Sequence, residues 1–148
     1  MSSTASTRKS SRNGLGPALP ARLAHAIGSI AQTLPNPWDE STDYFTPFSA
    51  EIDASKPMDA DSLRRALHVG VHYQLDLASA DLTATGANLS DDNLATGFAL
   101  LDVVMKSTLT DITRVTARAP GVTRVRTWVL GRFAQGWLVG LRTESTET

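Results

Sequence analysis

The stretch TRVRTWVLGRFAQGWLVGLRT, residues 123–143, decides the fold. Residues 123–130 alternate polar and apolar side chains and are rich in β-branched and aromatic types, which is typical of a half-buried strand. Residues 137–143 predict a second strand, whose alternate apolar positions are expected in the core: Trp137, Val139 and Leu141. Residues 131–136 have the length of a hairpin loop, so the two strands are predicted to be antiparallel neighbours.

Two amphipathic helices are predicted upstream of this hairpin. In each, apolar residues recur at steps of four, three and four and so share one face: Leu23, Ile27, Ile30 and Leu34, then Leu94, Phe98, Leu101 and Met105. The first helix is expected between Pro20 and Pro35, because proline suits a helix start and disfavours helix in the residue before it. Ser90 is the expected N-cap of the second helix, since its hydroxyl can accept from unpaired backbone N–H groups.

The other segments complete an α+β fold. Residues 48–53 and 112–116 are predicted strands, and a short helix opened by an aspartate is expected to end near Val69. Residues 72–77 fit a helix or a strand equally well, and the small polar residues of 78–89 predict a loop. We therefore expect helices packed on a mostly antiparallel sheet.

Composition and length predict one soluble globular domain. The chain has 148 residues, of which 41% are hydrophobic and 20% charged, a balance typical of proteins with a buried core. Residues 1–18 are poor in apolar side chains, so we expect a disordered basic tail there and the domain at residues 19–148. The absence of cysteine excludes disulfides and thiolate zinc sites and favours a reducing, cytoplasmic location.

Charge is divided unevenly along the chain. Residues 1–38 hold four basic residues and no acidic one, whereas residues 39–148 hold ten basic and fifteen acidic residues. The tail is open to three interpretations: an ordinary solvated tail, a transit-like segment, or an arm that binds nucleic acid weakly. The net charge of −5 on residues 39–148 argues against other nucleic-acid binding. No apolar run approaches the ~20 residues of a membrane span, so no membrane partner is expected.

Motifs of enzymes and cofactor sites are missing from the sequence. It contains neither a glycine-rich phosphate loop nor a nucleophile elbow. His68 and His72 could face one way on a helix, but two ligands are too few for a metal site, and we expect them, like His25, to be ordinary polar residues. We therefore predict a protein that is not an enzyme and needs no cofactor or metal ion of its own.

Residues 36–47 combine acidic and aromatic side chains in a predicted loop. Its five candidate residues are Trp38, Asp39, Glu40, Asp43 and Tyr44. Aromatic residues beside charges are typical of interface hot spots. The acids could also be solvated, or could act as a general acid and base, although one loop rarely fixes two carboxylates at the required separation. Binding to a partner's cation or metal ion is the functional interpretation that we retain.

Arg124 and Arg126 are expected on one face of their strand, together with Trp128. Such a strand could bind phosphate, but single-stranded nucleic-acid platforms carry more aromatic residues and a more basic body. Pairing of these arginines with local acids is the favoured interpretation.

Two local sequences and the order of the elements resemble the nuclease A inhibitor family. GWLVGLRTESTET, residues 136–148, is similar to the family's C-terminal strand with its internal glycine and terminal Glu-Thr. DESTDYF, residues 39–45, is similar to its acidic loop leading into Tyr and Phe before a strand. The helix at residues 94–107 followed by three strands also fits, and the resemblance covers residues 21–148.

The resemblance implies an α-β-α sandwich that inhibits a sugar-non-specific DNA/RNA endonuclease by occupying its active site. Glu40 and Thr148 would then approach the catalytic Mg²⁺ of the nuclease, with Glu147 beside them and the aromatic and acidic residues of the loop around them. Mg²⁺ prefers hard oxygen ligands, so the chemistry is reasonable. The alternative is a non-enzymatic interaction or regulatory module of the same fold with a basic N-terminal arm; an enzyme using Asp39, Glu40 and a histidine is the least favoured.

Overall fold

The computed structural model describes residues 16–38 and 44–146. Within these ranges the chain forms helices α2 (Ala18–Ala31), α3 (Ala60–Ala66), α4 (Leu82–Ala87) and α5 (Asp92–Thr108), and strands β1 (Thr46–Glu51), β2 (Gln74–Ser79), β3 (Thr110–Arg118), β4 (Arg124–Phe133) and β5 (Trp137–Thr146). The strands form one open sheet in the order β1-β5-β4-β3-β2, with every pair antiparallel. The fold is therefore α+β, as the sequence predicts. No helix in the described ranges has the length and apolarity to span a membrane.

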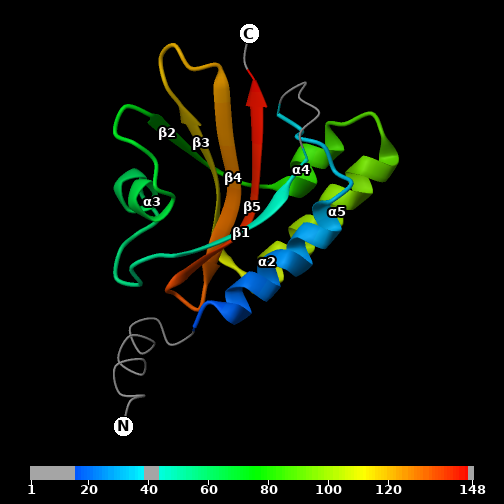
Figure 1. The fold of residues 1–148 in the computed structure, drawn as a ribbon. Coiled ribbons are helices and arrows are strands. Elements are labelled where there is room, and N and C mark those ends of the chain that lie inside the picture. Colours follow the sequence, from blue (N-terminus) through cyan, green and yellow to red (C-terminus); the bar gives the residue numbers. More distant parts are fainter. Residues whose placement is uncertain (1–15, 39–43, 147–148) are drawn as a thin grey trace.

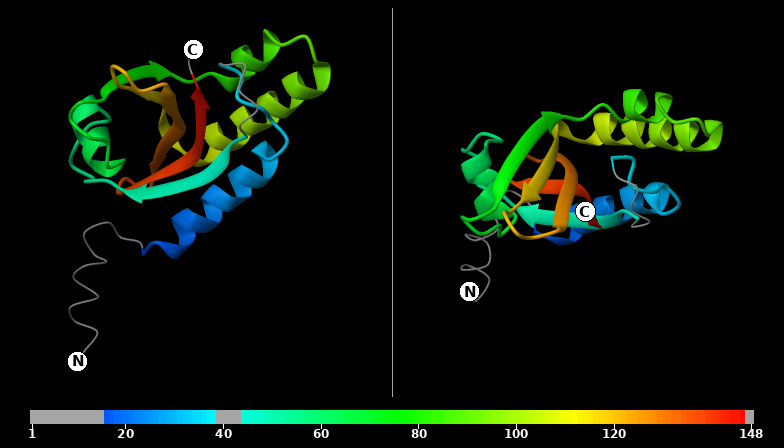
Figure 2. Two further views of the ribbon diagram at one scale, coloured as in Figure 1. Left: turned by 45° about the horizontal axis from the view of Figure 1, so that its top comes forward. Right: turned by 90° about the horizontal axis from the view of Figure 1, so that it is seen from above.

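Helices cover both faces of the sheet (Figure 1). One face packs against α2 and α5, and its core includes Ile27, Phe98 and the predicted core residues Val139 and Leu141. The other face packs against the short helix α3, whose Leu63 is fully buried. The two further views show α2 and α5 together on one side and α3 on the other (Figure 2). The core is thus split in two by the sheet.

The hairpin of β4 and β5 forms as predicted but has a much shorter loop. Phe133 pairs with Trp137, so the expectation of a loop over residues 131–136 is wrong. Gly131 does not break the strand; a Cβ there would lie 2.7 Å from the carbonyl oxygen of Thr110, so glycine instead permits close strand packing. Ala134 and Gln135 adopt positive φ angles of 51° and 67°, which closes the turn within three residues.

Both predicted amphipathic helices are confirmed. α2 begins at Ala18, the last residue of the predicted tail, whereas residues 1–15 of that tail lie outside the described residues. The N-cap of α5 is Asp91 rather than Ser90: its carboxylate accepts from the backbone N–H groups of Asn93 and Leu94. An aspartate at this position also places negative charge at the positive end of the helix dipole, which a serine does not.

The predicted loop at residues 78–89 is wrong, because α4 lies within it. The Asp81 carboxylate accepts from the Ala84 N–H and so caps the helix, and Leu82 anchors it in the core. Gly86 lies against α5, where an added Cβ would come within 2.8 Å of the Phe98 Cβ. Small residues that suggested a loop therefore allow two helices to pack closely. The ambiguous segment 72–77 contributes most of β2, which pairs with β3 at the sheet edge.

The short helix after β1 is confirmed as α3, with Asp59 accepting from the Ser62 N–H. His68 follows this helix and adopts a positive φ of 56°, and His72 stacks on Tyr73 further along the chain. The two histidines therefore do not share a helix face, because α3 ends before His68. His25 is exposed on α2.

Asp102 joins α4 to α5 through a buried carboxylate. It is only 5% exposed and accepts from the Leu82 N–H and the Thr83 hydroxyl, both at 3.0 Å. The Lys106 ammonium lies 2.8 Å from the same carboxylate. Burial raises the pKa of Asp102, but the hydrogen bonds from Lys106, Leu82 and Thr83 outweigh it, so the net pKa is lowered. The charged form is therefore the one that stabilises the fold.

We expect Asp102→Asn to destabilise the protein at pH 7 by about 2 kcal/mol, because the amide loses the charge-assisted bonds. A lowered pKa in the folded state gives stability that is present above the unfolded value of about 3.9 and is lost as pH falls below it. The gap between wild type and variant should therefore narrow in acid. Urea unfolding from pH 7 to pH 2 measures it, and a gap that stays constant throughout would contradict this role of the carboxylate.

Candidate functional site

Most of the predicted site residues lie outside the part of the chain that the structure describes. These are Asp39, Glu40, Asp43, Glu147 and Thr148. The described residues Trp38 and Tyr44 flank the acidic segment 39–43, and Thr146, the last residue of β5, precedes the other segment.

The flanks of both segments lie at the same edge of the molecule. Trp38 and Ser145 line one cavity. Tyr44 lines a second hollow together with Thr143 and Glu144 of β5. A β-bridge between Pro35 and Tyr44 joins the two sides of the loop that carries the acids. The chain therefore enters and leaves the acidic segment beside the end of β5, where the C-terminal segment starts (Figure 1).

Trp38 is partly buried rather than freely exposed. Its ring meets Phe45 edge to face with 6.1 Å between centroids, and its backbone N–H donates to the Asn36 side chain at 3.0 Å. The Arg114 guanidinium stacks on the Trp38 ring, 4.9 Å from the ring centroid. Tyr44 is 57% exposed. Of the two described candidates, Tyr44 is thus available for direct contact, whereas Trp38 anchors the loop.

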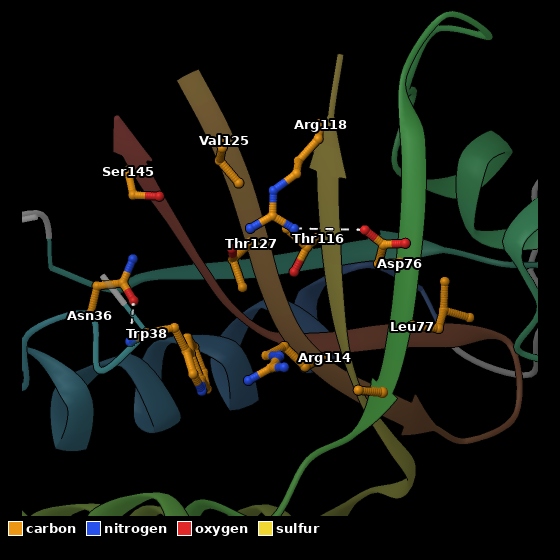
Figure 3. A pocket seen from close by; sticks show the side chains of 11 residues that line it. Asn36, Trp38, Asp76, Leu77, Arg114, Thr116, Arg118, Val125, Thr127 and Ser145 are labelled. Atoms are coloured by element: carbon orange, nitrogen blue, oxygen red, sulfur yellow. Dashed lines mark hydrogen bonds and ion pairs between the residues drawn. The ribbon is translucent and has the colours of Figure 1, made fainter. Parts of the chain in front are cut away.

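The cavity beside Trp38 has a volume of 340 Å³ and lies on the sheet face that also carries α2 and α5. Side chains from four strands reach it, as Figure 3 shows. Asp76 of β2 pairs with Arg118 of the neighbouring strand β3 in the cavity wall, at 3.6 Å. Thr127 of β4 and Ser145 of β5 are almost fully buried in its wall. The cavity is thus polar on its sheet side and aromatic at the loop.

Glu144 on β5 lies between two arginines. Its carboxylate accepts from Arg124 and from Arg142, the latter at 2.7 Å. The hydrogen bond from Arg124, followed by that from Arg142, lowers the pKa of Glu144, so it is ionised at neutral pH. This confirms the expected pairing of Arg124 with a local acid. Arg126, on the same strand face, instead stacks on the rings of Tyr73 and Trp128.

Thr143 carries a buried hydroxyl without a hydrogen-bond partner among the described residues. The residue is 3% exposed. Thr143→Val keeps the shape and removes this unsatisfied group, so we expect it to raise the free energy of unfolding by about 1 kcal/mol. Thr113→Val is the control, because its hydroxyl donates to the Asp111 carbonyl and its loss should not stabilise. Thermal unfolding compares the two; a lower midpoint for Thr143→Val would contradict the prediction.

The cavity residues Arg114, Thr127 and Ser145 were not among the sequence-based candidates. A signal for one wall was present: Arg114, Thr116 and Arg118 alternate along β3, which places three polar groups on one sheet face. Their meeting with Trp38 could not be predicted, because it depends on how the loop packs. Among the described residues no group of three or more His, Cys, Asp or Glu is arranged to hold a metal ion.

The chain matches no protein-family model, and no curated protein matches it significantly. The interpretation of the site therefore rests on the two sequence motifs and on the geometry given above. That geometry brings the described ends of both motifs to one edge of the sheet.

Proposed function

We propose that the protein is an inhibitor of a Mg²⁺-dependent, sugar-non-specific nuclease. The acidic segment 39–43 and the residues Glu147 and Thr148 would enter the nuclease active site together. One observation carries the proposal: Trp38 and Ser145, which flank the two segments, line the same cavity. Segments that start from one edge can reach one cleft of a partner.

The acids in these two segments suit a magnesium centre. Mg²⁺ prefers oxygen ligands and keeps positions occupied by water, which a carboxylate can replace or contact through water. Glu40 and Thr148 are the proposed groups nearest the ion, and Asp39, Asp43 and Glu147 would add negative charge around them. Tyr44, exposed beside the acidic segment, would provide apolar contact area at the rim.

Charge at this edge supports the same partner. The described acids near it are already paired: Glu144 with Arg124 and Arg142, and Asp76 with Arg118. Attraction toward a basic nuclease cleft would thus come mainly from segment 39–43 and Glu147. The net charge of −5 on residues 39–148 would add long-range steering, which raises the association rate.

The test is a titration of the full chain against a Mg²⁺-dependent nuclease that cleaves both DNA and RNA, with cleavage of a fluorescent duplex as the readout. Inhibition should be complete at equal molar amounts. The association rate of the two proteins should fall as the salt concentration rises. A metal-independent ribonuclease serves as the control and should stay active. Full cleavage at a large molar excess, with no complex seen by calorimetry, would reject the proposal.

The same preparation separates the alternative module with a basic arm. A variant lacking residues 1–15 should inhibit as well as the full chain, because the proposed contacts lie elsewhere. If the full chain binds DNA at low salt, fails to inhibit, and loses DNA binding on removal of residues 1–15, the interaction-module alternative holds instead.

A further inference from the structure

Arg114 is a half-buried cation without a carboxylate partner in the described part of the chain. The ion pairs there involve other cations: Lys106, Arg118, Arg124, Arg132 and Arg142. Arg114 instead stacks on the ring of Trp38 and lines the 340 Å³ cavity. A partly desolvated guanidinium keeps up to five donors in a rigid plane, and it favours an anion in reach of them.

The cavity wall offers buried hydroxyl groups on the neighbouring strands β4 and β5. Thr127 and Ser145 are 6% and 4% exposed and line the cavity. Thr116 adds a third hydroxyl from the strand that carries Arg114. Figure 3 shows these side chains around the space between β5 and β2. Hydroxyl donors beside a guanidinium form a suitable setting for an oxyanion.

Apolar surface completes the cavity. Trp38 closes it on the loop side, and Leu77 and Val125 lie in its wall. Its volume is at the lower end of the roughly 300–1,000 Å³ of small-molecule sites. The combination of a few polar groups with aromatic and aliphatic walls is typical of pockets for small organic ligands rather than of sites for inorganic ions.

The charges of the lining residues define the charge of the ligand. Arg114 and Arg118 are positive, and Asp76 is negative and pairs with Arg118. Over the described residues that line the cavity, the formal sum is therefore a single positive charge, which Arg114 holds. A ligand with one negative charge balances it, whereas a dianion would also meet repulsion from Asp76.

We propose that this cavity binds a small organic monoanion, namely a carboxylate with a short apolar body. The carboxylate accepts from the Arg114 guanidinium and from the hydroxyls of Thr116 and Thr127, which are partners in the β3–β4 register. The apolar body lies between Trp38 and the aliphatic residues of the wall. This site does not depend on nuclease inhibition, since it uses none of the residues proposed to enter the nuclease.

The experiment titrates three probes into the full chain: benzoate, its neutral analogue benzamide, and phenyl phosphate. The indole N–H signals in a proton–nitrogen NMR spectrum report the binding site. Trp38 lines the cavity, whereas Trp128 packs on the opposite sheet face and Trp137 lies at the other end of β5. Benzoate should shift the Trp38 signal saturably, with a Kd of about 1 mM as expected of a small fragment.

Variants test whether Arg114 holds the carboxylate. Arg114→Met should weaken benzoate binding about tenfold, because a charge-assisted bidentate contact is lost. Arg126→Met is the matched control: it removes the same charge from a guanidinium stacked on aromatic rings of the opposite face and should leave the affinity unchanged. Thr127→Val, which preserves shape, should weaken binding about threefold and covers the case in which Arg114→Met does not fold.

Each other result overturns the proposal. A Trp38 signal that does not respond to benzoate, or that responds equally to benzamide, removes the carboxylate site. Equal weakening by Arg114→Met and Arg126→Met would show an effect of overall charge only. A stronger response to phenyl phosphate than to benzoate would contradict the single negative charge assigned to the ligand.

Discussion

Replacing Asp39 by Asn and Glu40 by Gln together is expected to weaken nuclease inhibition by about 100-fold or more. The physical reason is that truncating or neutralising a charge that meets a buried partner charge costs about 2–5 kcal/mol, and each 1.4 kcal/mol is tenfold in affinity. Deleting Glu147 and Thr148 should have an effect of the same order. The inhibition constant from duplex cleavage measures both. The fold should be kept, since Thr146 still pairs with Arg124 in the β4–β5 register.

The control removes the same charge elsewhere. Asp61→Asn with Asp92→Asn takes two negative charges from the first turns of α3 and α5, outside the two segments proposed to enter the nuclease. These two substitutions should lower the association rate slightly through weaker electrostatic steering, and they should leave the dissociation rate unchanged. If the control weakens inhibition as much as the Asp39 and Glu40 pair does, the contribution of the acidic segment is general charge. The mechanism at the magnesium ion would then be wrong.

Gly140→Ala should destabilise the protein by about 3–5 kcal/mol or prevent folding, since overpacking against backbone cannot be relieved by a rotamer change. Gly140 lies in the middle of β5, opposite Leu130 of β4. A Cβ there would clash with the Val129 carbonyl oxygen and would lie 2.7 Å from the Leu130 Cα. Phe48 of β1 pairs with Gly140 from the other side, so β5 has little freedom to move away.

Urea unfolding compares Gly140→Ala with Gly16→Ala. An added Cβ at Gly16 meets no atom within 4 Å, so this control should change stability by less than about 0.5 kcal/mol. Inhibition by any folded fraction of Gly140→Ala should also fall, because β5 carries the C-terminal segment. A loss of under about 1 kcal/mol for Gly140→Ala would mean that the strands separate more easily than their packing indicates.

Elements with a strong sequence period were predictable. The apolar stripes of α2 and α5 and the alternation in β4 and β5 are visible within one short stretch of chain each, because each pattern reflects one buried face. The errors have a common cause. α4 consists of small residues whose helix is stabilised by the Asp81 cap and by close packing on α5, and the glycine in β4 suits a neighbouring strand rather than a turn. The packing of Gly86 on α5 and of Gly131 against β3 joins residues far apart in sequence, so neither leaves a periodic signal.

By itself, the sequence determined the α+β class, the two long helices, the C-terminal hairpin and the uneven charge. These follow from the spacing of apolar and charged residues along the chain. Only the tertiary structure decided that β5 lies between β1 and β4, that Trp38 meets Ser145 at one cavity, and that Arg114 lies there without a carboxylate partner among the described residues. Such arrangements depend on strand order and loop packing between residues far apart in sequence, which no local period encodes.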